Sequence, residues 1–531
     1  MGSDAPAGRE VCAGPLHVWL GPDVDAHAAI GPDVDPDRLL TDPDCRIIKL
    51  QRKVMVGRVG TGAGALYVKR YNVHAWRVAL GSLVRVSPAR RAFVAARTLS
   101  SLGFGVPEVV AAVEERRLGM LRRSFFVTRE VTDSLTADRH WAALATAPAA
   151  DRRRFARRLG ELFRRLHAAG VYHNDLKDVN VLVCRRGEAP EFVLLDLERV
   201  HVGAVTGRRR RIKNLVQLER TLGRGASAPT RMRFLEAYLG GHPSRSERRT
   251  WAAAVVAAAA RKERRAGQAP PAAAREPVAC AIVCQDEAAH IAACLESATW
   301  CDELVVVDGG SRDATIDIAR RFTSRVIEHP WPGYRAQKQY ALEAAREPWV
   351  LSLDADERVT PELASEIRSA LVSVSADVDG FAVPRLVPYL GRWWYRGGWY
   401  PRPKIRLVRR TRAAWGGVDP HDRLEVSGRV LRLESPILHY TYPDVAGHLR
   451  SVARLTAVAA AQVPPGRRVG LARLAGEPAW RFVRFALVRR SILEGVPGLF
   501  VAATDAFYVF LRWARVWERE RRRVDARAPD R

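Results

Sequence analysis

The strongest constraint on the fold is a pattern that occurs three times between residues 278 and 371. A short apolar run is followed by a polar turn and then by an amphipathic segment, in VACAIVCQDEAAHIAACLESA, CDELVVVDGGSRDATIDIARRF and WVLSLDADERVTPELASEIRSAL. Strands that alternate with helices of this length predict a parallel α/β sheet with right-handed crossovers. Ligands of such sheets bind at the carboxyl ends of the strands, where Asp286, Asp308 and Asp354 fall.

Acidic residues at these strand ends indicate a cation-dependent site. SLDADE places Asp354 and Asp356 directly after an apolar strand. Adjacent acids repel each other, and Mg²⁺ or Mn²⁺ bridging a diphosphate would remove that cost. Asp308, which ends LVVVD, is positioned to accept hydrogen bonds from a base or ribose, and Asp286 and Glu287 line the same rim. The sequence therefore predicts a nucleotide-sugar pocket.

A different chemistry is indicated earlier in the chain by the segment VYHNDLKDVNVLV, residues 171–183. Phosphoryl transfer needs a carboxylate that accepts a hydroxyl proton, and oxygen ligands that hold Mg²⁺ on the phosphates. Asp175 can accept the proton. Asn180, five residues on, and Asp196, which follows a predicted hairpin in LLDLERV, can hold the metal.

Three basic residues complete this predicted kinase site. Lys69 in LYVKRY lies on an early strand, from which a lysine can bind the phosphates. Lys177 can neutralise the transferring phosphate, and His173 is interpreted as a brace for the loop backbone. The order and spacing of these groups are those of a phosphoryl-transfer enzyme that uses ATP.

Residues 46–240 resemble the protein-kinase-like fold, and GELFRRLHAAGVYHNDLKDVNVLV and RIKNLVQLERTLGR resemble the lipopolysaccharide core kinase family. The resemblance implies phosphorylation of Kdo or heptose on the inner core. Two features depart from the family pattern. SPARRAFVAARTLSSLG, where a helix should supply a glutamate for Lys69, contains no acidic residue, and GRVGTGAG is not a regular glycine-rich loop. An inactive, kinase-like binding domain is the alternative.

Residues 278–460 resemble glycosyltransferase family 2 with its GT-A fold. CDELVVVDGGSRDAT, HPWPGYRAQKQYAL and LSLDADERVTPEL resemble its lipopolysaccharide core β-glucosyltransferase branch. The resemblance implies inverting transfer of a hexose, with UDP-glucose the expected donor and a core heptose the expected acceptor. An inverting enzyme needs a carboxylate that deprotonates the acceptor hydroxyl.

The same resemblance assigns site residues. It implies Asp422 as the base, with His421 beside it in VDPHDRLEV, and an ordinary turn is the alternative interpretation of that segment. It also implies that Arg335, Gln337 and Lys338 lie near the donor. The segment YLGRWWYRGGWYPRPKIRLVRR offers aromatic rings for sugar stacking and arginines for phosphate or carboxylate groups.

Charge and cysteine content narrow the partners and the compartment. The formal net charge of +28 attracts anions, namely an anionic membrane, a phosphorylated substrate such as the lipid A–core acceptor, or nucleic acid. No nucleic-acid-binding module accompanies the charge, so no nucleic-acid partner is expected. The seven cysteines include no CxxC pair, which favours a reducing compartment. No signal peptide or bilayer-spanning run is recognised.

The predicted fold is an α+β protein-kinase-like domain followed by a mostly parallel α/β GT-A domain and a helical membrane-surface segment. The expected parts are a loose arm over 1–45, a kinase-like domain over 46–246, a helix and linker over 247–277, a GT-A domain over 278–460 and amphipathic helices over 461–531. The tail interleaves apolar runs with arginines, which suits the inner face of the cytoplasmic membrane. Packing against the catalytic domain is the plain alternative.

Both predicted sites suit one growing glycolipid, because a kinase joined to a sugar transferase is expected to act on a sugar. The sequence therefore predicts a bifunctional enzyme of the lipopolysaccharide inner core. Two alternatives remain open: a glycosyltransferase with an inactive kinase-like domain, and a protein kinase that regulates the transferase attached to it.

Overall fold

The computed structural model describes most of the chain and divides it into two compact units. The described residues are 10–13, 16–22, 36–51, 53–62, 64–73, 76–184, 191–203, 205–266, 275–372, 374–395, 398–419 and 421–525. Most of those up to 266 form the first unit, and those from 275 onward belong to the second. Each unit has its own hydrophobic core.

The first unit contains a seven-stranded sheet in the order β1-β2-β6-β7-β5-β4-β3. In chain order, the strands are β1 (Glu10–Ala13), β2 (Leu16–Leu20), β3 (Arg46–Gln51), β4 (Val54–Thr61), β5 (Gly64–Asn72), β6 (Val109–Arg117) and β7 (Met120–Arg129). Along β5, buried and partly buried residues alternate, the period of a strand with one face on a core. The helices of this part are α2 (Pro36–Thr41), α3 (Trp76–Gly81) and α4 (Pro88–Ser101).

The prediction of a loose arm over residues 1–45 is wrong for part of that range. β1 and β2 pair with each other, and β2 pairs with β6, so both strands belong to the sheet. Strands of four and five residues are too short to show a clear alternation in the sequence. Their stability depends on pairing with strands that are distant in the chain. The repeated GPDVD segments at 21–25 and 31–35 lie almost entirely outside the described residues.

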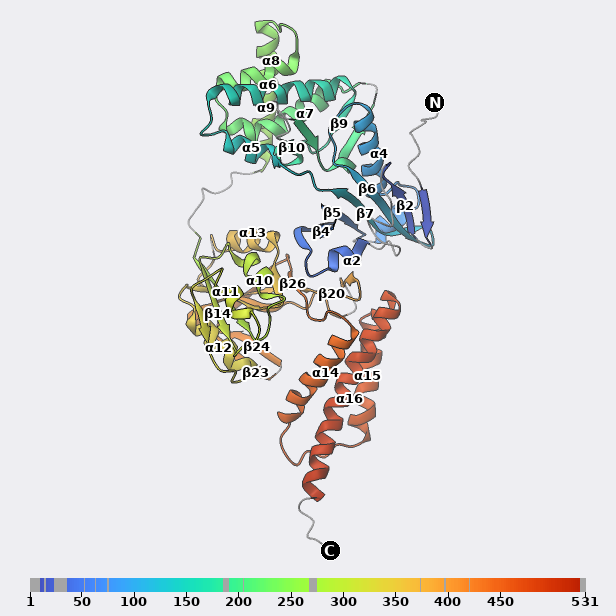
Figure 1. The fold of residues 1–531 in the computed structure, drawn as a ribbon, viewed down its shortest axis with the longest axis vertical. Coiled ribbons are helices and arrows are strands. Elements are labelled where there is room, and N and C mark those ends of the chain that lie inside the picture. The colour runs from blue at the N-terminus through green and yellow to red at the C-terminus, as the bar shows by residue number, and fades with distance from the viewer. Residues whose placement is uncertain are drawn as a thin grey trace. The chain divides into compact units, whose positions relative to one another are not determined.

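The rest of the first unit is mainly helical, and Figure 1 shows its helices gathered beyond the sheet. The helices are α5 (Ala137–Ala143), α6 (Ala149–Ala168), α7 (Arg208–Glu219), α8 (Ala228–Leu239) and α9 (Arg245–Ala266). The short strands are β8 (Ser134–Thr136), β9 (Val171–His173), β10 (Val181–Cys184), β11 (Glu191–Leu194) and β12 (Val200–Val202). β10 and β11 form the hairpin expected after the loop. Val255 and Ala259 of α9 pack into this core, so α9 belongs to the first unit.

The second unit is built on a seven-stranded mixed sheet in the order β15-β14-β13-β16-β22-β18-β25. Its strands are β13 (Val278–Cys284), β14 (Glu303–Asp308), β15 (Val326–Glu328), β16 (Trp349–Asp354), β18 (Val378–Val383), β22 (Lys404–Arg409) and β25 (Arg429–Arg432). The first four strands in sheet order are parallel, as the sequence predicts, but β22 runs antiparallel to both β16 and β18. The sheet is therefore mixed.

Helices cover both faces of this sheet, which explains why all seven residues of β13 are buried and apolar. Val278, Cys280 and Ile282 pack with α10 (Ile291–Ala298) and α13 (Pro361–Ala370). Ala279 and Ala281 pack on the other face with α12 (Tyr334–Ala344). A strand buried on both faces reads as a continuous apolar run, so β13 could be recognised without alternation.

Short strands extend the second unit beyond its main sheet. They are β17 (Glu357–Val359), β19 (Arg385–Leu386), β20 (Pro388–Tyr389), β21 (Arg392–Trp393), β23 (Ala413–Val418), β24 (His421–Val426) and β26 (Ile437–His439), and α11 (Thr315–Ala319) follows β14. β17 and β26 pair antiparallel, as do β23 and β24. These pairings bring late parts of the chain to the carboxyl ends of β13, β14 and β16.

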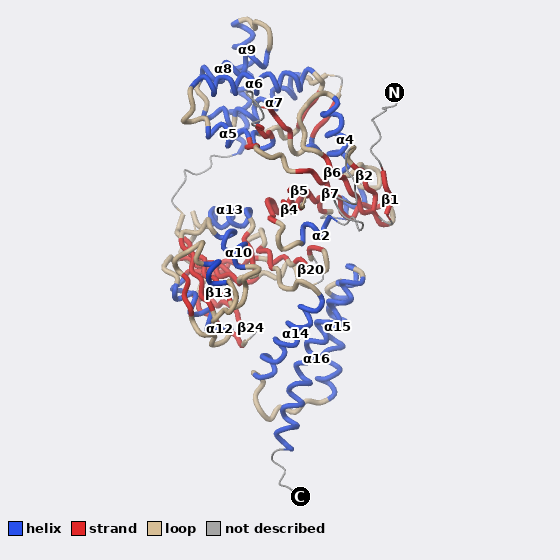
Figure 2. Tube along the Cα trace, in the orientation of Figure 1, coloured by secondary structure: helices blue, strands red, loops and turns tan. Residues whose placement is uncertain are grey.

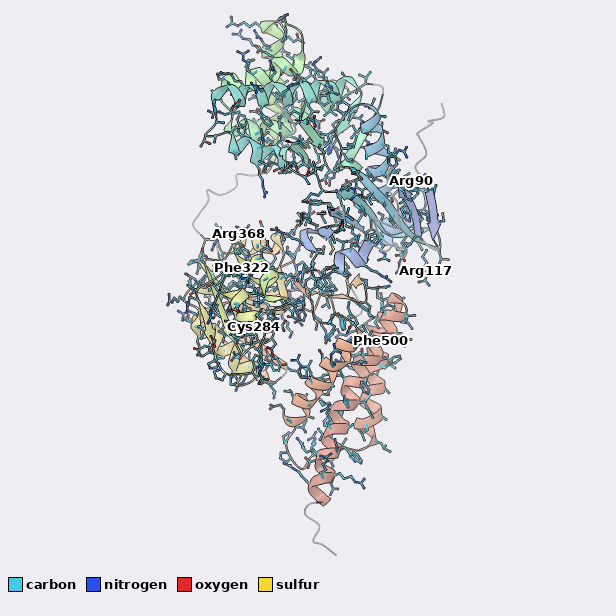
Figure 3. All side chains as sticks on the ribbon, viewed as in Figure 1. Arg90, Arg117, Cys284, Phe322, Arg368 and Phe500 are labelled. Atoms are coloured by element: carbon cyan, nitrogen blue, oxygen red, sulfur yellow. The ribbon has the colours of Figure 1, made fainter. Side chains whose placement is uncertain are left out.

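The C-terminal part is a helical bundle, in which α14 (Val445–Ala461), α15 (Glu477–Val483) and α16 (Val496–Asp525) lie side by side (Figure 2). Phe485 and Val501 of the bundle pack with Tyr389 and Trp394, and Phe500, labelled in Figure 3, borders this cluster. The bundle thus packs against the rest of the second unit. In the part of the chain that the structure describes, no helix is long and apolar enough to cross a bilayer.

Close packing of α6 on α8 depends on Gly160. A Cβ atom at this position would lie 2.4 Å from the carbonyl oxygen of Phe234 and 3.0 Å from the Cβ of Ala237. Gly160→Ala is therefore expected to destabilise the first unit by about 1–3 kcal/mol, despite the better helix propensity of alanine. Chemical unfolding of the full chain, with hydrogen exchange of α6 and α8, measures the effect. Gly203→Ala, where a Cβ meets open space, is the control, and equal unfolding midpoints would contradict the prediction.

Candidate active sites

In the first unit, the groups predicted for phosphoryl transfer converge on Lys69 of β5. Its Nζ lies 2.6 Å from Asp196 Oδ1, and 2.8 and 3.0 Å from the two carboxylate oxygens of Glu198. Burial alone would lower the pKa of Lys69, but Glu198 and Asp196 raise it, so the lysine is charged. Asp196 has a left-handed backbone with φ of 55°, a conformation that aspartate tolerates better than most residues.

His173 fixes the loop that follows β9. Its Nδ1 accepts a hydrogen bond from the Asp175 N–H at 3.1 Å, and its Nε2 donates to the Leu195 carbonyl at 2.9 Å. Burial lowers the pKa of His173, which agrees with a neutral ring in this tautomer. Asn180 Nδ2 also donates to the Asp175 carbonyl, at 2.8 Å. These bonds join the loop that carries Asp175 to the strand end that precedes Asp196.

The Asp175 carboxylate lies between two cations. Lys177 Nζ is 3.0 Å from Oδ1, and Arg199 Nη1 is 3.3 Å from Oδ2. Lys177 was predicted for this site, whereas Arg199, which lies on the turn after Asp196, was not. Both cations are half exposed, with side-chain exposures of 48% and 51%, and can also attract a phosphate.

Polar residues of α7, which were not predicted, form hydrogen bonds with the backbone of the loop that carries Asp175. Asn214 Nδ2 donates to the His173 carbonyl at 2.6 Å. Gln217 Nε2 donates to the Asn174 carbonyl at 2.9 Å, and its Oε1 accepts from the Leu176 N–H at 3.1 Å. A signal was available, because amides three residues apart on the buried face of a helix require hydrogen-bond partners.

The glycine run GRVGTGAG, residues 57–64, begins within β4 and ends at the first residue of β5. In a protein kinase the glycine-rich loop covers the phosphates, and the lysine lies on a later strand. Here the run immediately precedes the strand that carries Lys69. The turn one hairpin earlier, between β3 and β4, contains Lys53 instead of glycines. The glycines therefore do not occupy the hairpin turn in which the glycine-rich loop of a protein kinase lies.

In the second unit, the ends of β13, β14 and β16 adjoin one another as the sequence predicts. Cys284 is in register with Asp308, and Val283 is in register with Asp354. Because parallel strands end at the same edge, the polar residues that follow them share one rim.

Asp354 is the centre of a chain of ion pairs. Its Oδ1 lies 2.8 Å from Lys338 Nζ, and its Oδ2 lies 2.9 Å from Arg406 Nη2. The same Lys338 Nζ lies 3.0 Å from Asp422 Oδ2, so Lys338 joins two predicted carboxylates from distant parts of the chain. Burial opposes ionisation of Asp354, but Lys338 and Arg406 hold its pKa well below the ordinary value. Asp354 is therefore a carboxylate at neutral pH.

Glu357, which was not predicted, pairs with the same Arg406 that pairs with Asp354. It is fully buried, and its Oε1 lies 2.6 Å from Arg406 Nη2 and 3.6 Å from Arg385 Nη1. Its Oε2 accepts a hydrogen bond from the Asp354 N–H at 3.1 Å. Glu357 and Arg406 are the kind of inward-facing charged residues that an apolar strand retains only when they are paired.

Asp356 is paired with His439, which was not predicted either. His439 Nε2 lies 3.2 Å from Asp356 Oδ2, and the Tyr440 N–H donates to the Asp356 carbonyl at 2.9 Å. The β17–β26 pairing sets this contact, because Glu357 and His439 are Cα partners. Burial raises the pKa of Asp356, but His439 lowers it below the ordinary value.

Glu287 faces the same cluster from the end of β13. Burial, together with the charges of Asp356 and Asp354, raises its pKa from 4.5 to about 7. The Asp356 carboxylate and the His439 imidazole are ligand types that Mg²⁺ or Mn²⁺ accepts, whereas both oxygens of Asp354 are already paired with Lys338 and Arg406.

Asp308 and Asp286 shape the loops around this rim. Asp308 is fully buried, and its Oδ2 accepts hydrogen bonds from the Gly310 and Ser311 N–H groups, each at 2.8 Å. Asp286 Oδ1 accepts from the Arg312 N–H at 2.7 Å. Both carboxylates therefore organise backbone turns, and the contact of Asp308 with a base or ribose stays a prediction.

Three further predicted residues make contacts outside the carboxylate cluster. The Gln337 amide is buried and accepts a hydrogen bond from His329 Nδ1 at 2.8 Å. His421 Nε2 lies 3.2 Å from the hydroxyl of Tyr508 on α16. Arg335 is exposed near the start of α12. The role of Arg335 and Gln337 near the donor, and that of His421 beside the base, stay predictions.

Comparisons with known proteins match both units. Residues 49–238 match the lipopolysaccharide kinase (Kdo/WaaP) family, and residues 280–421 match glycosyl transferase family 2. The lipopolysaccharide core biosynthesis glycosyltransferase LpsC of Rhizobium meliloti (strain 1021) is 30% identical over 251 residues, which cover 46% of this chain and 93% of that protein. An uncharacterised glycosyltransferase of Rickettsia prowazekii (strain Madrid E) is 29% identical over 253 residues, covering 44% of this chain and 85% of that protein.

Among solved structures, the one described as WaaP in complex with acyl carrier protein is 20% identical, with a TM-score of 0.37. The match covers 47% of this chain and 99% of that chain.

The folds and sites define a kinase-like unit followed by a GT-A-like transferase unit. The chain belongs to glycosyltransferase family 2, and its first unit is a domain of the lipopolysaccharide kinase (Kdo/WaaP) family. Both predicted resemblances are confirmed. The protein thus combines a domain of the lipopolysaccharide kinase (Kdo/WaaP) family with a glycosyltransferase family 2 domain.

The raised pKa of Glu287 predicts a pH-dependent stability. Its pKa of about 7 in the folded state exceeds the ordinary 4.5, so the folded state binds the proton more tightly. The stability that this proton confers is present below about pH 4.5 and is lost as the pH rises through about 7. In chelator-treated protein, Glu287→Gln should leave the melting temperature unchanged at about pH 4 and raise it by several degrees at about pH 8. Glu296→Gln on α10 is the control. The same shift at both pH values would contradict this assignment.

Proposed function

We propose that the chain is a bifunctional enzyme of lipopolysaccharide inner-core assembly. The first unit phosphorylates a core sugar, Kdo or heptose, with ATP, and the second transfers glucose from UDP-glucose to a core heptose. The observation that carries the proposal is that one chain contains two separate sites in which lysines hold acidic residues, around Lys69 and around Lys338. Each site suits a substrate that carries phosphates.

In the second unit, Asp422 accepts the proton of the acceptor hydroxyl while that oxygen attacks the anomeric carbon of the donor. The glycosidic bond forms as the bond from the anomeric carbon to the diphosphate breaks, and UDP leaves with the electron pair. Lys338 orients Asp422 at 3.0 Å and adds a positive charge beside the leaving group. Asp356 and His439 are placed to hold Mg²⁺ or Mn²⁺, which would neutralise the departing diphosphate.

In the first unit, Asp175 accepts the proton of the sugar hydroxyl while the oxygen of that hydroxyl bonds to the γ-phosphorus of ATP. The bond between that phosphorus and the bridging oxygen breaks, and ADP leaves. Lys69 binds the phosphates, and Lys177 lies beside Asp175 to neutralise the transferred group. Asn180 and Asp196 are the residues placed to hold Mg²⁺.

A basic cluster in the second unit supports an anionic acceptor. The guanidinium groups of Arg402, Arg481 and Arg489 lie 5.8, 5.2 and 5.5 Å from the ring centre of buried Phe485. Of these three arginines, Arg481 pairs with Asp505. Burial lowers the pKa of Arg402, and so do the charges of Arg489 and Arg481. Such a cluster attracts the phosphate and carboxylate groups of an inner core.

An exposed apolar edge on the bundle supports binding to an anionic membrane. The edge comprises Leu487, Val488, Ile492, Leu493, Val496 and Leu499, with exposures from 46% to 81%. Arg484, Arg489 and Arg490 lie in the same stretch of chain. Apolar side chains among arginines suit the interface of a bilayer with anionic headgroups, close to a lipid-linked acceptor. The proposed location is the inner face of the cytoplasmic membrane.

Charged substitutions on the apolar edge should weaken membrane binding. The double variant Val488→Asp and Val496→Asp is expected to reduce co-sedimentation with phosphatidylglycerol vesicles by about 10-fold, because each charge opposes insertion. Leu471→Asp is the matched control: Leu471 is 83% exposed but lies outside the edge. Binding that is equal in both variants, or absent from the unmodified protein, would overturn the membrane assignment.

Product analysis tests the two activities. The purified chain, a heptosylated Kdo–lipid A acceptor, ATP, Mg²⁺ and UDP-glucose should yield products with added phosphate and added hexose. Asp175→Asn should reduce phosphate addition alone, and Asp354→Ala hexose addition alone, each by at least about 100-fold. Asp317→Asn, an exposed acid of α11, should retain both activities.

Each other outcome identifies a different function. Hexose addition without phosphate would make the first unit an inactive kinase-like domain, and phosphate on serine or threonine of this chain would make it a protein kinase. If neither phosphate nor hexose is added, the assigned acceptor is wrong.

A further inference from the structure

We infer that Glu198 is the positioning residue that holds Lys69 for phosphate binding, in place of a glutamate from the helix that carries it in protein kinases. The inference rests on the proposed phosphoryl transfer by the first unit. It assigns a role to a residue that neither the sequence motifs nor the family match identified.

The helix expected to supply this glutamate is α4, and it has none to offer. α4 contacts β6, β7 and the Leu197–Arg199 turn, which places it beside the phosphate lysine. Its sequence, PARRAFVAARTLSS, contains three arginines and no acidic residue. Its buried face consists of alanines with Phe93 and Leu99, so this face offers no carboxylate to Lys69. In an active protein kinase, a lysine–glutamate pair has to be in place.

Glu198 meets the geometric requirement for that pair. Both of its carboxylate oxygens lie within 3.0 Å of Lys69 Nζ, at 2.8 and 3.0 Å. The side chains are 14% exposed for Lys69 and 11% for Glu198, so solvent screens the pair only weakly. Leu197, between Asp196 and Glu198, is buried in the core. The turn thus anchors itself through Leu197 and directs both acids to the lysine.

The two acids serve different purposes. Asp196 contacts Lys69 through Oδ1 and is the acid assigned to the metal, whereas Glu198 contacts the lysine through both oxygens. A lysine with Asp196 as its main partner would compete with the metal for that carboxylate. Glu198 lets Lys69 keep a carboxylate partner while Asp196 holds the metal.

The position of Glu198 also determines what can break the pair. In protein kinases the pair depends on where the helix lies. Here both acids belong to one short segment after β11, two residues apart. The acid of the pair therefore does not lie on α4, and α4 can act on the pair only through its contact with the Leu197–Arg199 turn.

A double-mutant cycle tests the inference. Glu198→Gln should lower kcat/KM for ATP at least about 10-fold, and should change it less than about 2-fold in a Lys69→Met background. Glu198→Asp should restore part of the loss. Glu191→Gln on β11 is the control with the same change of net charge. Hexose transfer by the same molecules should be unchanged in every variant. The cycle is measured in parallel on the dissociation constant of MgATP, which needs no sugar acceptor.

Each result separates the inference from the proposed function. Phosphate transfer with equal losses in both backgrounds, or with no loss in Glu198→Gln, would falsify the role of Glu198 and leave the kinase function standing. Absence of phosphate transfer, with coupling still seen in MgATP binding, would overturn the kinase function and retain the pair. Absence of MgATP binding by the unmodified chain would overturn both.

Discussion

A buried carboxylate stays charged only where a cation or hydrogen-bond donors lie close to it, and pairing with cations organises both units. In the second unit, Lys338 and Arg406 hold Asp354, and these residues come from α12 and β22. In the first unit, Lys69 of β5 forms ion pairs with Asp196 and Glu198. Removing one partner of a buried pair costs about 3–5 kcal/mol, because the other charge is left uncompensated. The residues that make the sites are therefore also residues that hold distant elements together.

Local patterns account for the parts of the fold and sites that could be predicted. β13 and β16 were recognisable because strands buried on both faces are continuous apolar runs, and acids at their ends mark the rim of a parallel sheet. Asp175 and Asn180 were recognisable because six consecutive residues of one loop contain both. In each case the information lies within a few consecutive residues.

Contacts between distant segments account for what was missed. His439 reaches Asp356 through the pairing of two three-residue strands, which are too short to show a period. Arg406 and the amide residues of α7 likewise find their partners through the tertiary fold. Asp308 shows a related limit. Its place at a strand end was predictable, but the hydrogen bonds that its carboxylate accepts from N–H groups of the following loop were not.

The two separate cores have a consequence for how the chain evolves. A substitution inside one core changes the free energy of unfolding of that unit, and distant, independent sites contribute additively. The kinase and transferase units can therefore accumulate sequence changes almost as if two genes encoded them. Translation nevertheless produces them in equal numbers, so expression cannot adjust one against the other. Any imbalance between the two steps has to be corrected through turnover rates.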